Sequence, residues 1–218
     1  MTTPAALTPT PSAPETTAPP RRRLLGMMAG LPLALLAPGR AFGAPTPAAT
    51  EGPFYPSPDM RLKDTDNDLV KIEGAVREAG GEVIFLTGRV LSRSGQPLEG
   101  ARVEIWQCDV NRRYLHRGDH GAARDGGFQG FGHDITGADG SYRFRTIMPV
   151  PYPGRTPHIH VKVLAFEQRL TTQFYIEGHA QNERDWLYGR MSRAEQRAVG
   201  MRFAAGKAGP EAKVDIVL

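Results

Sequence analysis

Residues 158–165 read His-Ile-His-Val-Lys-Val-Leu-Ala, and this alternation of polar and apolar side chains is typical of a β-strand. Side chains two positions apart on a strand point to the same face and lie roughly 6–7 Å apart along the chain. We therefore expect His158 and His160 to project together, while the apolar side chains between them face the core. Two imidazoles at this separation are able to converge on one metal ion.

Short runs of similar character lie on both sides of this stretch. They cover Val83–Leu91, Ala101–Gln107, Tyr142–Ile147, Leu170–Ile176 and Val214–Leu218. Turn residues such as Ser94–Pro97 and Asp139-Gly140 separate them, and Ser192 with Glu195 resembles a capping box that opens a short helix toward Phe203. The pattern predicts a mainly β fold, an antiparallel β-sandwich with long loops and one or two short helices.

The chain divides into three segments by composition. Residues 1–43 have the character of an export signal, residues 44–82 of a linker and N-terminal arm, and residues 83–218 of the β-sandwich domain. Within that domain, residues 111–137 form a long, glycine- and charge-rich excursion that holds Tyr114, His116, His120 and His133. Long loops in compact β domains are often functional, so we look for chemistry here first.

The N-terminal segment has the three parts of an export signal. Arg21–Arg23 and Leu24-Leu25 precede the apolar run Met27–Ala37, and Ala41–Gly43 offers small residues for cleavage. The apolar run is too short to span a bilayer. Paired arginines before leucines resemble a twin-arginine signal, which predicts a periplasmic or secreted protein exported in the folded state. The alternative is a basic tail on a cytosolic protein.

Composition excludes few classes of protein. The chain has 218 residues and a single cysteine, Cys108, so no internal disulfide forms. The formal net charge is +4, but part of it lies in the arginine run of the signal. We therefore expect neither a nucleic-acid partner nor a membrane association after export.

Tyr152, held between Pro151 and Pro153, lies close in sequence to the histidine pair. Zinc and ferrous sites usually complete a histidine pair with a carboxylate or another histidine. A phenol loses its proton near pH ~10, so only a hard, trivalent ion such as ferric iron readily takes it as a ligand. Tyr152 beside His158 and His160 thus points to Fe(III). The plainer interpretation is two half-exposed histidines and a turn aromatic packed on proline.

Several segments in a fixed order resemble the intradiol ring-cleavage dioxygenases, in particular the protocatechuate 3,4-dioxygenase type. The resemblance covers roughly residues 50–190 and rests on residues 88–90, 95–107, 114–116, 139–147, 151–153, 155, 158–160 and 172–175. It implies cleavage of a catechol-type ring by O2 at Fe(III), with a cis,cis-muconate-type product. It also implies a homo-oligomer.

The resemblance also implies a role for particular residues. Tyr114, Tyr152, His158 and His160 match the four iron ligands, with Tyr152 as the ligand that leaves when substrate binds. Arg155 matches an arginine beside the substrate ring, and Gln173 a glutamine behind the ligands. Members of the protocatechuate type have a longer, tryptophan-containing segment between the second tyrosine and the histidines, so the ring substituent stays open between protocatechuate, catechol and a substituted catechol.

Two alternatives belong to other classes. Residues 88–107 also resemble transthyretin-like modules, which are secreted binding domains without catalysis and need no paired tyrosines. A zinc hydrolase would complete the histidine pair with a carboxylate such as Asp134 or Glu177. Of the remaining aromatic residues, Tyr55 and Trp106 are expected to pack or to wall the cavity, and His116, His120, His133 and His179 to be loop or surface histidines.

Overall fold

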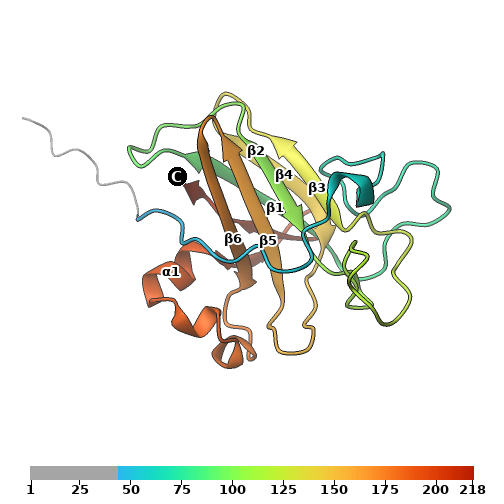
Figure 1. Ribbon diagram of the computed structural model, residues 1–218. Helices are drawn as coiled ribbons and strands as arrows, with labels where there is room; N and C mark the ends of the chain where they lie inside the picture. Colours follow the sequence, from blue (N-terminus) through green and yellow to red (C-terminus); the bar gives the residue numbers. More distant parts are fainter. Residues whose placement is uncertain (1–43) are drawn as a thin grey trace, which may run out of the picture. The chain divides into compact units, whose positions relative to one another are not determined.

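The computed structural model describes residues 44–218, so the expected signal region, residues 1–43, lies outside the described part of the chain. The described residues form two β-sheets, one α-helix and three short 3-10 helices (Figure 1). The elements are η1 (Pro58–Met60), β1 (Val83–Leu91), β2 (Arg102–Trp106), β3 (Phe131–Ile135), β4 (Ser141–Ile147), β5 (His158–Ala165), β6 (Gln168–Ile176), η2 (Asn182–Arg184), η3 (Tyr188–Arg190), α1 (Arg193–Ala198), β7 (Gly200–Met201), β8 (Phe203–Ala205), β9 (Pro210–Lys213) and β10 (Ile216–Val217). No helix within this range has the length and apolar character needed to cross a membrane.

The first sheet is built around β1. β4 pairs with it antiparallel over seven residue pairs, while β9 and β10 pair with it in parallel and β8 pairs antiparallel with β9. The mainly β, two-sheet fold that the sequence predicts is confirmed. The longer ladders are antiparallel, and the short strands β9 and β10 on β1 and β7 on β6 pair in parallel.

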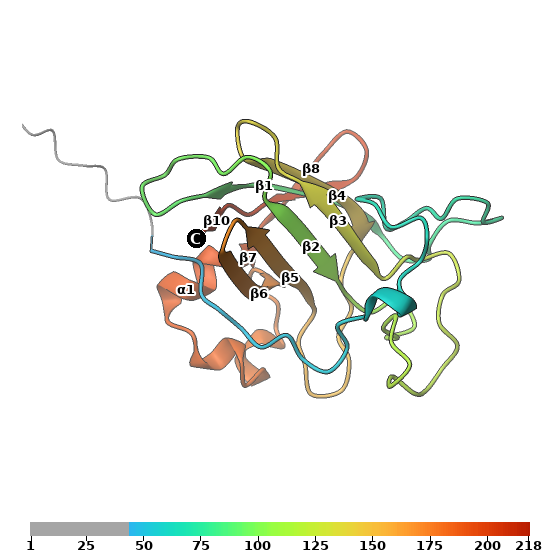
Figure 2. The ribbon, with the colours of Figure 1, turned by 45° about the horizontal axis from the view of Figure 1, so that its top comes forward.

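The second sheet has the order β3-β2-β5-β6-β7 and carries the histidine pair. Figure 2 shows β5 and β6 in one layer and β1, β4 and β8 in the other. The antiparallel ladder places His160 of β5 opposite Trp106 of β2 and Gln173 of β6. Residues opposite one another in a ladder share a face, so this register gathers these three side chains on one side of the sheet.

Apolar side chains between the two sheets form the main core. On β5 these are Ile159, Val161 and Val163, all fully buried, as the alternation predicts. The other face of β5 is also buried at its start, because His158 and His160 are only 2% and 3% exposed. The expectation that the histidines and the apolar residues face opposite ways is confirmed. The histidines therefore lie beneath another part of the chain.

That covering part is the segment before η1. The Ala49 N–H donates to the Thr171 carbonyl, and the Thr50 carbonyl accepts from Gln173 Nε2, so both bonds tie the segment to β6. Glu51 forms an ion pair with Lys162 of β5. In Figures 1 and 2 this segment, coloured blue to cyan, runs across β6 and β5. Residues 44–60, which we call the N-terminal strap, thus close the outer face of the second sheet.

The loop that the sequence predicts over residues 111–137 is shorter in the structure. Residues 131–135 within it form β3, which pairs with β2 through five residue pairs. Gly130, Gly132 and the polar residues after them conceal the strand, whereas burial of Phe131 and Gly132 against the sheet decides it. The expected capping box is present at Ser192 and Glu195, but the helix ends at Ala198 because β7 and β8 follow at once.

Candidate metal centre

His158 and His160 point their Nε2 atoms at one another, 3.1 Å apart. The His158 Nδ1–H donates to the Thr156 carbonyl at 2.7 Å, which leaves the His158 Nε2 as the nitrogen with the free lone pair. Two imidazole nitrogens that each lie about 2.1 Å from one ion, at right angles, are about 3 Å apart. The pair therefore has the separation of two ligands that share an ion.

Tyr114 and Tyr152 lie beside this pair. The Tyr114 ring is 5.8 Å from that of His160, the Tyr152 ring is 5.4 Å from that of His158, and the two tyrosine rings are 5.6 Å apart and nearly perpendicular. The structure thus brings together all four residues that the resemblance implies as ligands, from two parts of the chain, the loop after β2 and residues 152–160.

Backbone hydrogen bonds to acidic side chains shape the loop that carries Tyr114. Asp109 Oδ1 accepts from the N–H groups of Asn111 and Arg113, and Asp119 Oδ2 accepts from the Tyr114 N–H at 2.6 Å. The Phe54 ring of the strap stacks on the Tyr114 ring at 5.0 Å. Tyr114 is 2% exposed, and its hydroxyl has no hydrogen-bond partner among residues 44–218. A buried hydroxyl without a partner is costly, so this oxygen is suited to a ligand that the polypeptide does not supply.

Tyr152 stands on a tight hairpin. The Arg155 N–H donates to the Tyr152 carbonyl at 2.9 Å, and Gly154 takes a φ of 81°, which favours glycine. Unlike Tyr114, Tyr152 is only half-buried. The less enclosed of the two phenols is therefore the one on the turn.

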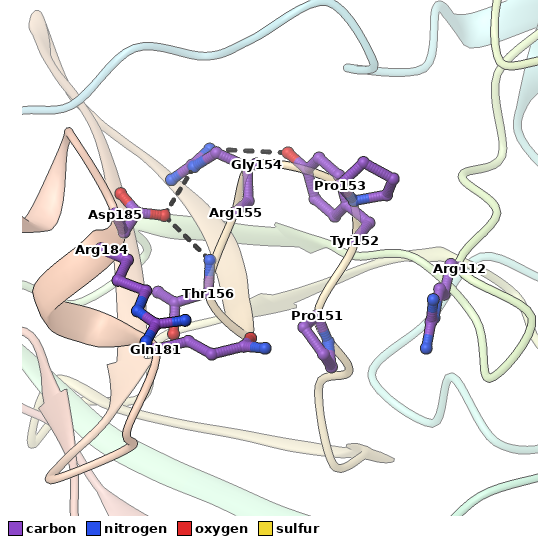
Figure 3. Close-up of a pocket in the computed structure, with 10 residues that line it drawn as sticks. All are labelled: Arg112, Pro151, Tyr152, Pro153, Gly154, Arg155, Thr156, Gln181, Arg184 and Asp185. Atoms are coloured by element: carbon purple, nitrogen blue, oxygen red, sulfur yellow. Dashed lines mark hydrogen bonds and ion pairs between the residues drawn. The ribbon is translucent and has the colours of Figure 1, made fainter.

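Arg155 binds four groups of the site (Figure 3 shows two of them, Tyr152 and Asp185). Its Nε donates to Asp185 Oδ2 at 2.8 Å, and its Nη2 donates to Gln173 Oε1 at 2.6 Å and to the Tyr175 hydroxyl at 3.4 Å. Its Nη1 lies 3.5 Å from the Tyr152 hydroxyl. The Tyr175 hydroxyl also donates to Gln173 Oε1. The guanidinium is thus held from three sides with its remaining edge toward Tyr152.

Burial decides the charge of the four candidate ligands in the absence of a cation. It lowers the pKa of His158 to about 4 and that of His160 well below its usual value, with neighbouring positive charge adding to the effect. Burial raises the pKa of Tyr114 well above its usual value, and that of Tyr152 less far, since Arg155 opposes the shift. Neutral imidazoles are ready ligands, and the phenols require a strongly charged cation to release their protons.

Other candidate residues are placed elsewhere. His120 is exposed, His133 is half-buried on β3, and His116 lies beside Tyr114 in a shallow surface hollow of about 440 Å³. His179 Nδ1 lies 3.4 Å from the Thr156 hydroxyl, behind the site. The structure therefore does not bring these histidines into the pair.

The carboxylates that a zinc site would need are engaged on other partners. Asp134 accepts from the Arg143 N–H, and Glu177 pairs with Arg202 through two bonds. Among residues 44–218, no three side chains of histidine, cysteine, aspartate and glutamate are grouped to hold a metal. The arrangement gives no support to the zinc hydrolase alternative.

A pocket of about 370 Å³ adjoins the site between the 151–156 hairpin and η2 (Figure 3). Tyr152 and Arg155 contribute to its wall, together with Arg112, Gln181 and Arg184. Tyr114 and the two histidines are not among its lining residues. The pocket thus reaches the side of the site where Tyr152 and Arg155 stand.

Three residues of the site were not foreseen from the sequence. Asp185 anchors Arg155, Tyr175 hydrogen-bonds Gln173, and Phe54 stacks on Tyr114. Asp185 follows a loop after β6 with no local pattern of its own. Tyr175 lies in residues 172–175, on which the resemblance rests, and this is the signal that would have drawn attention to it.

Comparisons with known proteins identify the family of this chain. A family described as Dioxygenase matches residues 50–218. The chain is 41% identical over 136 residues to the protocatechuate 3,4-dioxygenase beta chain of Burkholderia cepacia, covering 58% of this chain and 57% of that protein. It is 34% identical over 152 residues to catechol 1,2-dioxygenase 1 of Acinetobacter lwoffii, covering 61% of this chain and 47% of that protein. The chain thus spans about half the length of the curated relatives it matches.

Solved structures give the same answer for the fold. The dioxygenase domain of a dioxygenase carbohydrate-binding protein fusion from Streptomyces sp. SirexAA-E superimposes with a TM-score of 0.61 at 36% identity, covering 80% of this chain and 98% of that one. An intradiol ring-cleavage dioxygenase from Tetranychus urticae, at 19% identity, has a TM-score of 0.61 and covers 80% of this chain and 94% of that one. A family match over most of the described residues separates the chain from transthyretin-like modules. The chain belongs to the intradiol dioxygenase family.

Proposed function

We propose that this chain cleaves a catechol-type aromatic diol with O2 between its two hydroxyl-bearing carbons, giving a cis,cis-muconate-type product. The observation that carries the proposal is the buried convergence of two phenols and two neutral imidazoles. The names of the relatives, which include catechol, hydroxyquinol and protocatechuate dioxygenases, support the same reaction class.

Tyr114, Tyr152, His158 and His160 would hold a ferric ion. The donor set fits such an ion, because two phenolates offset two of its three charges and so reduce the cost of burying it. When bound, ferric iron would draw electron density from a coordinated catecholate and make its ring carbons reactive toward O2. The orphaned Tyr114 hydroxyl and the 3.1 Å spacing of the imidazole nitrogens are the features of this chain that fit it.

Tyr152 is suited to accept a proton from the substrate. Its oxygen is the less enclosed of the two phenol oxygens and lies at the wall of the adjoining pocket, where a diol arrives. A phenolate there would take a proton from a catechol hydroxyl and turn away, while Tyr114 stays fixed by the Phe54 ring.

Arg155 is placed to stabilise negative charge on the substrate. Its Nη1 edge faces the Tyr152 oxygen, and its other nitrogens are occupied by Asp185 and Gln173. A guanidinium fixed in advance stabilises charge that develops during a reaction without the cost of reorienting. Gln173 accepts a hydrogen bond from Arg155 and so helps to orient the guanidinium.

We also propose that the protein is exported in the folded state and forms a homo-oligomer. The arginine pair and the apolar run of residues 21–37 support export, because a twin-arginine route carries proteins folded around a cofactor. Fractionating cells that express the full chain, or a version with Arg21–Arg23 replaced by lysine, tests export, and light scattering tests assembly.

Oxygen uptake with a panel of catechols tests the proposed activity. Iron-loaded protein should consume one O2 for each ring opened and release muconate-type products. His160→Gln should abolish uptake, whereas His120→Gln, which changes an exposed loop histidine, should leave it intact. Uptake with no member of the panel, or products cleaved outside the two hydroxyl-bearing carbons, would refute the proposal.

A further inference from the structure

The two histidines are oriented by different means. The His158 ring is fixed by the bond from its Nδ1 to the Thr156 carbonyl. The His160 Nδ1 is buried and has no hydrogen-bond partner within residues 44–218. A metal-binding histidine almost always uses its second nitrogen in a hydrogen bond that sets the orientation of the ring. Something other than a protein hydrogen bond must therefore hold the His160 ring.

Trp106 supplies a flat surface for that ring. The indole of Trp106 and the imidazole of His160 lie 4.8 Å apart between centroids and only 12° from parallel, across the β2–β5 ladder. Trp106 is fully buried, and its Nε1–H has no hydrogen-bond partner in the described chain. A buried indole N–H usually has a hydrogen-bond partner. Because this one has none, the contact that Trp106 makes with the site is through the face of its ring.

Tyr55 of the strap holds the indole in turn. Its ring meets that of Trp106 edge-on at 4.9 Å, and its hydroxyl donates to Glu104 Oε2 at 2.7 Å. Glu104 is 2% exposed and also accepts from Arg102 Nε at 2.8 Å. A buried carboxylate with two donors is a rigid anchor, and it fixes the position of Tyr55 and through it that of Trp106.

We propose that Trp106 is a positioning residue that sets the orientation of His160 toward the ferric ion, and that Tyr55 bound to Glu104 keeps Trp106 in place. This inference rests on the proposed function, because it takes His160 as an iron ligand. It assigns a role in metal binding to a tryptophan that acts through His160 and does not itself bind the ion.

Replacing Trp106 separates this role from simple packing. Trp106→Leu removes the flat face, and Trp106→Phe keeps an aromatic one. Phe144→Leu is the matched control, because Phe144 is also a buried phenylalanine but lies on β4 of the first sheet, in the main core and against Tyr142. Ferric affinity is measured by competition with a chelator, together with the phenolate-to-iron absorption band and the thermal stability of the metal-free proteins.

Loss of the indole ring in Trp106→Leu should weaken ferric binding by about 10–100-fold, which is the usual effect of removing a group that orients a metal ligand. Trp106→Phe should recover most of the affinity, and Phe144→Leu should lose stability but keep both affinity and band. Wild-type affinity in Trp106→Leu, or an equal loss in Phe144→Leu, would overturn the inference.

A second variant serves if Trp106→Leu does not fold. Tyr55→Phe keeps the ring and removes the hydroxyl that bonds Glu104 and Arg61, so it should weaken ferric binding relative to wild type and shift the absorption band. An unchanged affinity and band in Tyr55→Phe would then contradict the inference. Failure of the wild-type protein to bind ferric iron is a different result, because it would refute the proposed function.

Discussion

Asp185 anchors the hairpin that carries Tyr152 and Arg155, and replacing it by asparagine tests this role. Its side chain is fully buried, and that of Arg155 is 11% exposed. Asp185 also accepts from the N–H groups of Thr156, Leu187 and Tyr188, at 3.0–3.1 Å. Asp185→Asn keeps the shape but leaves the Arg155 guanidinium buried without its counter-ion.

The expected cost is large. Removing one partner of a buried ion pair destabilises a protein by about 3–5 kcal/mol, and we expect about 3 kcal/mol here because the asparagine oxygen still accepts one N–H. In a chain of this size each kcal/mol lowers the melting temperature by about 2–4 °C, so the variant should melt about 6–12 °C below wild type. Circular dichroism of the metal-free proteins measures this difference.

Glu177→Gln is the control of matched geometry. Glu177 and Arg202 form two bonds of 2.7 and 2.8 Å, as short as the bond between Arg155 and Asp185, but their side chains are 35% and 80% exposed. Solvent screens such a pair, so its loss should leave the melting temperature nearly unchanged. If Asp185→Asn melts together with Glu177→Gln, burial does not decide the strength of these pairs, and the anchoring role of Asp185 is refuted.

Three further changes test other parts of the account. Tyr142→Phe removes the 2.6 Å bond from the hydroxyl to the Val214 carbonyl and should lower the free energy of unfolding, measured in urea, by about 1–3 kcal/mol. An unchanged urea midpoint would contradict the role of Tyr142 in fixing the C-terminal strands. Gly88→Ala places a Cβ 1.8 Å from the same carbonyl and should prevent folding, so a soluble protein with a wild-type spectrum would be evidence against the β1 register. Asp125 is buried, which raises its pKa, but the N–H groups of Gly127 and Gly80 outweigh this and lower it. The ionised Asp125 carboxylate therefore stabilises the fold above its usual pKa of about 3.9, and this effect is lost as the pH falls through the lower pKa of the folded state. The stability difference between wild type and Asp125→Asn should shrink below about pH 4. A difference that stays constant with pH would exclude this linkage.

The sequence is sufficient for the parts of the fold that rest on local pattern. The ends of β1 and β5 agree with the predicted runs Val83–Leu91 and His158–Ala165. A clean alternation of polar and apolar residues arises when one face of a strand packs against the core. β3 is concealed by glycine and charge, and β7 to β9 are too short to show a period. β3, β7 and β9 are decided by pairing with distant strands, which no local window contains, and β8 follows from its hairpin with β9.

The candidate site also has a part that the sequence predicts and a part that it does not. Tyr152, Arg155, His158 and His160 lie in one short segment, so spacing alone places them near one another. Their supports come from far along the chain: Asp185 is thirty residues from Arg155, and Tyr55 is far from Trp106. Such contacts depend on how the strap and the loop after β6 fold over the second sheet, and this arrangement has no signature in composition or periodicity.

The visible absorption of the ferric protein tests the central claim most directly, because phenolate-to-iron charge transfer requires a tyrosine oxygen on the metal. We predict a red-brown band in the wild-type protein and its loss in the Tyr114→Phe/Tyr152→Phe double variant. A band that persists unchanged in that variant, or a wild-type protein that binds ferric iron without colour, would contradict the assignment of these two tyrosines as ligands.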